Sequence, residues 1–96
     1  MEKFAKWDMA EALETKDDVI ACLDVALADM DMEFLFETLG ALARAKGMTQ
    51  IARQTGLSRE QLYRSFGADG NPTLRTTLAV MKALGIELSA KPTAVL

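Results

Sequence analysis

The stretch MTQIARQTGLSREQLYRSF, residues 48–66, decides the fold of this chain. Ala52 and Gly56 stand four positions apart, a spacing at which two helices can cross closely and the chain can turn between them with a positive φ. Ser58 is a favourable N-cap for a second helix over residues 59–66. Three apolar residues can anchor the two helices: Ile51, Leu57 and Leu62. Together these features predict a helix-turn-helix.

The second of these helices has an exposed face that suits DNA. At helical spacing Arg59, Glu60 and Arg64 point outward together. Leu62 and Phe66 point toward the core. Arginine can bridge O6 and N7 of guanine, and glutamate can accept from the cytosine amino group. The plain alternative is an ordinary helical corner with exposed arginines, although packing does not require a basic face there.

Two more helices are predicted before this motif. Thr15 followed by Asp18 indicates one helix N-terminus, and Asp31 can cap a second helix that ends near Gly47. Gly40 lies inside the second helix at a cost of about 1 kcal/mol relative to alanine, which indicates that another element approaches closely. Apolar residues at helical spacing predict one buried stripe on each helix. The stripes are Val19, Ile20, Leu23, Ala26, Leu27 and Met30, and then Phe34, Leu35, Leu39, Leu42 and Ala43.

A closing helix is predicted after the motif. Thr73 can cap a helix that ends at Gly85. Its predicted inner face consists of Leu74, Leu78, Met81 and Leu84. Beyond it, Ile86 and Leu88 alternate with polar residues and can add a short strand. The predicted fold is therefore all-α, a five-helix bundle with a possible short C-terminal strand.

The chain is expected to form one domain, because 96 residues are too few for two independent cores. Its predicted segments are a leader (1–14), an acidic helical pair (15–47), the helix-turn-helix (48–66), the closing helix (73–85) and a tail (86–96).

Charge is divided between the two ends of the chain. Residues 1–40 carry three lysines against eleven acidic residues, a charge of −8, whereas residues 41–96 carry eight basic residues against three acidic ones, a charge of +5. The net charge of −3 therefore hides two oppositely charged regions. The acidic half is either a solvated surface or the site of a basic partner. The arginine-rich half favours phosphates or base edges.

Catalysis and metal binding are not expected. The chain has no histidine, the usual general base near neutral pH and the commonest metal ligand. The single cysteine, Cys22, has no cysteine partner and sits in an apolar run, so a buried small residue is predicted. No enzyme, metal or cofactor is therefore predicted. No 18-residue apolar stretch or secretory signal occurs, so a cytoplasmic protein without membrane contact is expected.

Three pieces of the chain carry a family resemblance: ARAKGMT at 43–49, GLSREQLY at 56–63, and the Gly70, Asn71, Pro72 triplet. Residues 48–88 resemble the Xre-type helix-turn-helix of phage repressors. From Trp7 to Leu88 the chain resembles the antidote proteins of bacterial toxin-antitoxin addiction modules, the HigA-like group whose toxins belong to the RelE/ParE superfamily. One departure is Ser65 and Phe66, where many Xre repressors carry glutamate or leucine.

The resemblance implies two partners. The basic half would bind operator DNA upstream of its own operon, with Arg59, Glu60 and Arg64 on base edges. Phosphates would be positioned by Gln50, Ser58, Gln61, Asn71, Thr73 and Arg75. The amphipathic leader would lie in a groove of a basic toxin. Its candidate toxin-binding residues are Phe4, Trp7, Asp8, Met9, Glu11 and Leu13.

Other interpretations remain open at this point. Trp7 can instead pack on the protein's own core. The chain can be a stand-alone Xre-type transcriptional regulator, or an interaction module that keeps the helix-turn-helix only as a scaffold. Helix-turn-helix proteins usually place two recognition helices one DNA turn apart, roughly 34 Å, so a homodimer is expected.

Overall fold

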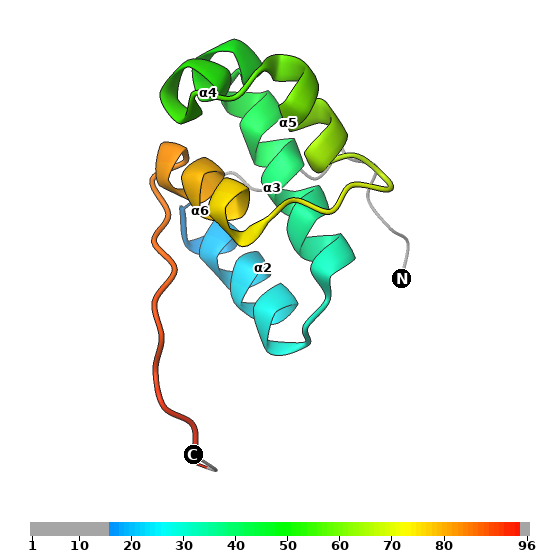
Figure 1. The fold of residues 1–96 in the computed structure, drawn as a ribbon. Helices are drawn as coiled ribbons and strands as arrows, with labels where there is room; N and C mark the ends of the chain where they lie inside the picture. Colours follow the sequence, from blue (N-terminus) through cyan, green and yellow to red (C-terminus); the bar gives the residue numbers. More distant parts are fainter. Residues whose placement is uncertain (1–15, 95–96) are drawn as a thin grey trace.

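The computed structural model describes residues 16–94, and that range contains five helices and no strand. The helices are α2 (Lys16–Ala28), α3 (Met32–Lys46), α4 (Met48–Thr55), α5 (Arg59–Ser65) and α6 (Leu74–Ala83). α3 runs from the turn after α2 at one end to α4 and α5 at the other, and α6 packs against α3 and α4 (Figure 1). The predicted all-α class is confirmed. The start expected at Thr15 lies outside the described residues.

α3 begins and ends where the sequence predicts. The Asp31 side chain accepts a hydrogen bond from the Phe34 amide at 3.1 Å, which confirms the predicted N-cap. Glu33 lies in the first turn, and Arg44 and Lys46 lie in the last turn. Acidic residues at the N-terminus and basic residues at the C-terminus both interact favourably with the helix dipole. Local electrostatics therefore stabilise the helix that spans the whole fold.

The core is assembled from all five helices. Phe36 of α3 meets Phe66 edge-on, with 6.2 Å between the ring centroids. A Cβ on Gly40 would lie 3.2 Å from both Cβ and the carbonyl oxygen of Phe66. The close approach predicted at Gly40 is therefore confirmed, and the approaching element is the end of α5. The buried cluster comprises Leu23, Ala26, Leu35, Leu39, Ala43, Met48, Ile51, Leu62, Phe66, Val80 and Met81.

Two predicted inner faces are partly wrong. Ile20 on α2 is exposed, because this helix packs mainly against α3 and buries only a narrow stripe. Met30 is exposed because α2 ends at Ala28 and Met30 lies in the turn that follows. On α6, Leu74 is 67 % exposed and Leu78 is 40 % exposed. Met81 is buried as predicted and Leu84 is partly buried, but the rest of the inner face consists of Thr77 and Val80. Neighbouring helices therefore meet α6 on a face rotated from the leucine stripe. Cys22, predicted to be buried, is only partly so.

The C-terminal end of α6 also differs from expectation. The helix ends at Ala83, and Gly85, with φ 78°, forms the turn after it. The Ile86 amide donates to the Met81 carbonyl at 2.8 Å, and the Gly85 amide donates to that of Lys82 at 3.0 Å. This is a Schellman turn, in which the glycine adopts the left-handed conformation. The predicted short strand is absent from the tail up to residue 94, because no second strand lies beside it to pair with its backbone.

Candidate nucleic-acid interface

The turn between α4 and α5 is built by local hydrogen bonds. Gly56 has φ 78°, as predicted, and its amide donates to the Ala52 carbonyl at 2.9 Å. The Thr55 hydroxyl donates to the Ile51 carbonyl at 2.8 Å and accepts from the Leu57 amide at 3.3 Å. These bonds satisfy backbone groups at the end of α4. The turn between the two helices is therefore built from residues that are neighbours in the sequence.

A capping box starts α5. The Ser58 hydroxyl oxygen accepts from the Gln61 amide at 3.0 Å, and the Gln61 side-chain oxygen accepts from the Ser58 amide at 2.9 Å. Reciprocal bonds of this kind stabilise a helix as short as this one. The two side-chain oxygens are thus used as acceptors within the capping box, so only the remaining hydrogens of these side chains could contact a phosphate. The Ser58 hydroxyl proton and the Gln61 amide hydrogens remain as donors for an acceptor such as a phosphate oxygen.

α5 is divided cleanly between a buried and an exposed side. Leu62 is completely buried and the adjoining Phe66 is 2 % exposed. Arg59, Glu60 and Arg64 are all exposed. The three predicted base-reading residues therefore share the open side of a helix whose other side is fixed in the core.

One neighbour of these residues was missed by the sequence reasoning. The guanidinium carbon of Arg59 lies 5.8 Å from the centroid of the Tyr63 ring, and Tyr63 is 45 % exposed. A cation over an aromatic face is held electrostatically. The four-residue spacing between Arg59 and Tyr63 on one helix could have indicated this contact. Tyr63 thus limits where the Arg59 side chain can go.

The loop after α5 passes very close to that helix. A Cβ on Gly70 would lie 2.1 Å from the Ser65 carbonyl oxygen, closer than any side chain permits. The Thr73 hydroxyl then caps α6: it accepts from the Thr76 amide at 3.1 Å and donates to the Thr76 hydroxyl at 3.2 Å. The Thr73 hydroxyl therefore caps α6 and lies at its exposed N-terminal end, where a phosphate could also approach.

The other predicted phosphate contacts are spread over three elements. Gln50 lies in the first turn of α4, Asn71 in the loop before α6, and Arg75 in the first turn of α6, and all three are exposed. Among the predicted positions that the structure describes, hydrogen bonds join only Ser58 to Gln61. Arg53, exposed in the last turn of α4, is an additional basic residue not singled out from the sequence.

The predicted toxin-binding residues, all in 1–14, lie outside the described residues.

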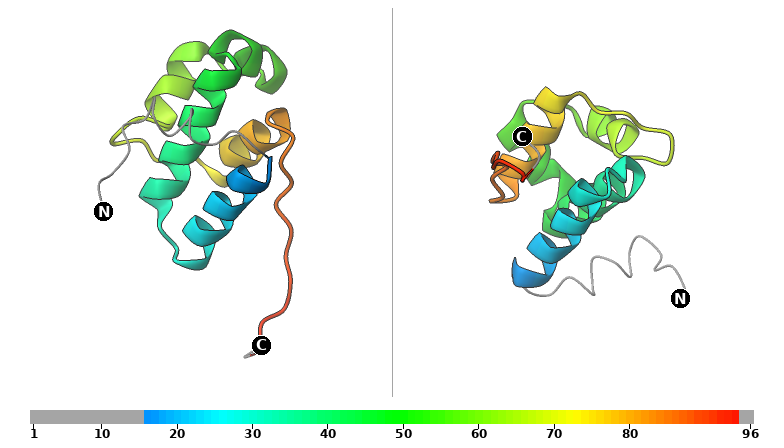
Figure 2. Two further views of the ribbon diagram at one scale, coloured as in Figure 1. Left: turned by 180° about the vertical axis from the view of Figure 1, so that it is seen from behind. Right: turned by 90° about the horizontal axis from the view of Figure 1, so that it is seen from below.

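Most acidic residues of the described chain lie on α2, α3 and the turn between them, whereas most basic residues lie from Arg44, near the end of α3, onward. Residues 16–43 carry one lysine against seven acidic residues, whereas residues 44–94 carry eight basic residues against three acidic ones. Both ribbon views place the α2–α3 turn and the α4–α5 unit at opposite ends of α3 (Figures 1 and 2).

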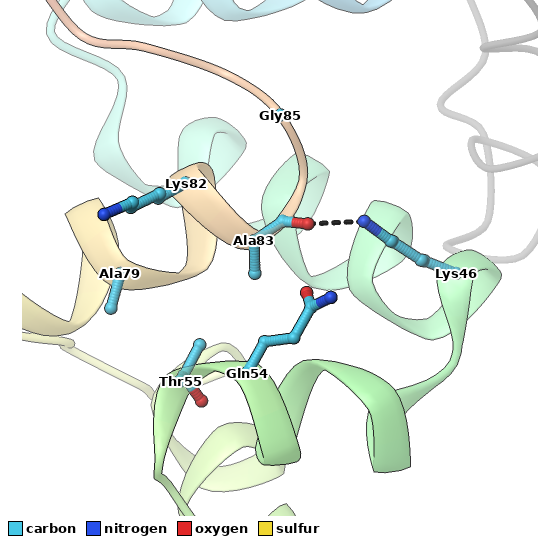
Figure 3. Close-up of a pocket in the computed structure, with 7 residues that line it drawn as sticks. All are labelled: Lys46, Gln54, Thr55, Ala79, Lys82, Ala83 and Gly85. Atoms are coloured by element: carbon cyan, nitrogen blue, oxygen red, sulfur yellow. Dashed lines mark hydrogen bonds between the residues drawn. The ribbon is translucent and has the colours of Figure 1, made fainter.

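A cavity of about 500 Å³ lies between α4 and the end of α6. Figure 3 shows Lys46 donating to the Ala83 carbonyl, with the Gln54 amide directed toward this pair from α4 and the Lys82 amine directed away. The Thr55 hydroxyl on its wall already donates to the Ile51 carbonyl. The Lys46 bond thus joins the end of α3 to the end of α6, whereas the Thr55 bond lies within α4. Lys46 also stabilises the C-terminal end of α6, where helix carbonyls carry partial negative charge.

No group of three or more histidine, cysteine, aspartate or glutamate side chains that could hold a metal ion occurs among residues 16–94. Within the same range, none of the helices combines the length and the apolar character needed to cross a bilayer.

This chain is similar to known proteins over nearly its whole length. Residues 3–92 match the family described as "Probable addiction module antidote protein". An uncharacterised protein of Haemophilus influenzae is 38 % identical over 90 residues, which cover 94 % of this chain and 93 % of that protein. No solved structure gives a significant match. With nearly its whole length matched, this chain belongs to the family of addiction module antidote proteins.

Proposed function

We propose that this chain is the antitoxin of a toxin-antitoxin module, that it neutralises a RelE/ParE-superfamily toxin, and that it represses its own operon. Repression would use sequence-specific binding of operator DNA by α4 and α5 in a cytoplasmic homodimer. Family membership supports the antidote role. One observation carries the DNA-binding part: α5 fixes Leu62 and Phe66 in the core and leaves Arg59, Glu60 and Arg64 together on its open side.

In this proposal α5 lies in the major groove. Arg59 and Arg64 contact guanine edges, and Glu60 contacts a cytosine amino group. Ser58, Gln61 and Asn71 donate to phosphates on either side, and Gln50 and Arg75 extend the contact from the first turns of α4 and α6. Thr73, at the N-cap of α6, contacts a phosphate as well. Reading bases from a short helix requires that helix to be held rigidly, which the capping box and the buried Leu62 supply.

The DNA-binding part is tested by fluorescence anisotropy with the chain's own upstream duplex and a scrambled duplex, at about 50 and about 200 mM salt. The expected result is a preference for the upstream duplex that persists at the higher salt. Arg64→Ala should cost about 1–3 kcal/mol and relax the preference at one base pair. Arg75→Ala should weaken both duplexes alike and reduce the salt dependence.

Lys91→Ala, on the exposed tail, serves as the matched control because it also removes one positive charge. Equal loss of affinity in Lys91→Ala and Arg64→Ala would contradict base reading by α5. Absence of binding at both salt concentrations would favour the interaction module that uses the helix-turn-helix as a scaffold.

The toxin-binding part draws on charge. Residues 16–43 form an acidic surface, and the leader adds Phe4, Trp7, Asp8, Met9, Glu11 and Leu13 as proposed contacts. A small basic protein encoded beside this chain should co-purify with it on co-expression, and Trp7→Ala should weaken that complex while Lys91→Ala leaves it intact. DNA binding without any such partner would instead identify a stand-alone transcriptional regulator.

A further inference from the structure

An exposed apolar face runs along α6 and into the tail. Leu74, Leu78 and Leu88 are 67 %, 40 % and 41 % exposed. Leu74 and Leu78 lie one helical turn apart, so they form one stripe beside the buried face of α6. A cavity of about 440 Å³ continues this stripe between Leu78 and Leu88, with Met81 and Ile86 in its floor. We call these three leucines and the cavity between them the leucine face.

Opposite charges flank the leucine face. Lys82 and Glu87 both line the cavity, and both side chains are exposed. Neither forms an ion pair with any residue between 16 and 94. A partner surface of a single charge would therefore be attracted by one of these residues and repelled by the other. A surface that carries the same two charges in reversed order would satisfy both.

A second copy of this chain is a partner of that kind. In a twofold-symmetric interface residue i contacts residue j, and j contacts i in return. A twofold axis that passes between Lys82 and Glu87 would place Lys82 of each copy opposite Glu87 of the other, beside the apolar residues of the face. We propose that the leucine face is the homodimer interface of this protein. The inference rests on the homodimer in the proposed function and names the surface that forms it.

The other exposed apolar region does not have this symmetry. Val25 on α2 is 56 % exposed, but Asp24 and Asp29 beside it are exposed as well. Two copies meeting through α2 would bring like charges together, which is unfavourable. The acidic residues of α2 therefore disfavour self-association through that helix and favour the leucine face.

The proposed interface also leaves the DNA-reading surface open. The leucine face lies on α6 and the tail, whereas Arg59, Glu60 and Arg64 lie on α5. The tail follows α6 directly and leaves the body of the fold (Figure 1), with exposed residues from 87 to 94. Its backbone is thus accessible to a second copy. Dimerisation through this face would present two α5 helices to DNA at once.

The experiment measures the monomer–dimer equilibrium of the full chain by sedimentation velocity over a concentration series. Leu78→Glu should raise the dimer dissociation constant about 100-fold, because the substitution occurs twice and each copy removes a central apolar contact. Val25→Glu is the matched control and should leave the constant unchanged. Thermal unfolding followed by circular dichroism checks that both variants are folded.

Charge reversal supplies a second test that keeps the apolar residues intact. Lys82→Glu and Glu87→Lys should each weaken the dimer by about fivefold. The double variant should restore the wild-type constant, since it rebuilds both pairs with reversed charges. A wild-type chain that stays monomeric at every concentration would overturn both the homodimer and this interface. A wild-type dimer that Leu78→Glu and both charge reversals leave unchanged would overturn the interface alone.

Discussion

Replacing Gly70 with alanine should strongly destabilise the fold. The added Cβ would lie 2.1 Å from the Ser65 carbonyl oxygen, 2.5 Å from the Ser65 carbonyl carbon and 2.6 Å from the Arg64 carbonyl oxygen. Non-bonded heavy atoms prefer roughly 3.5 Å, so the overlap exceeds about 1 Å. All three atoms are backbone at the end of α5, so no side chain can rotate away. Overpacking typically costs about 1–3 kcal/mol, and we expect about 3 kcal/mol here.

The assay is thermal unfolding of the purified variant by far-ultraviolet circular dichroism. For a domain of this size about 1 kcal/mol corresponds to about 4–8 °C in Tm, so Gly70→Ala should lower Tm by about 12–24 °C. Gly85→Ala is the control, because Gly85 has φ 78° and open space around its Cβ position. Its stability should fall by only about 1 kcal/mol, the cost of placing a residue with a Cβ in the left-handed conformation. A loss for Gly70→Ala no larger than that for Gly85→Ala would refute the close approach of this loop to α5.

Three further predictions concern local features. Met30→Gly should stabilise the fold by about 0.5–1 kcal/mol, because Met30 is 78 % exposed and has a left-handed φ of 54°. The measurement is denaturant unfolding, and an unchanged midpoint would show that no strain is stored at Met30. Ser58→Ala should cost about 1 kcal/mol by breaking the capping box, and Ser58→Asp should recover most of it. Tyr63→Leu should relax base preference at the position read by Arg59 without changing the salt dependence of binding, whereas Tyr63→Phe should retain the preference; identical preferences in both variants would rule out positioning through the ring.

The helix-turn-helix could be predicted in detail because its signals are local. The glycine at Gly56, the N-caps at Asp31, Ser58 and Thr73, and the approach at Gly40 all appear where expected. The turn and the caps depend on hydrogen bonds or steric limits within a few residues. The approach at Gly40 was indicated differently, because glycine inside a helix lowers its stability and suggests that another element lies close by. The exposed side of α5 followed from the same spacing.

The face of α6 could not be predicted in the same way. Leu74 and Val80 are both apolar, and each lies four positions from another leucine, so the pattern alone does not say which of the two stripes is buried. The packing of α6 against α3 and α4 selects Val80 and leaves Leu74 in solvent. The tail shows the same limit, because alternation of Ile86 and Leu88 is compatible with a strand but cannot supply the second strand that its backbone needs.

The sequence by itself determined the helices, their caps and turns, the division of charge, and the residues that α5 exposes, because each depends on neighbours along the chain. Only the tertiary structure decided which stripe of α6 is buried, that Phe66 closes against Gly40, and that Gly70 lies against the backbone of α5. Those outcomes depend on where distant elements meet, and the free energy of burying a side chain depends on the surface that covers it.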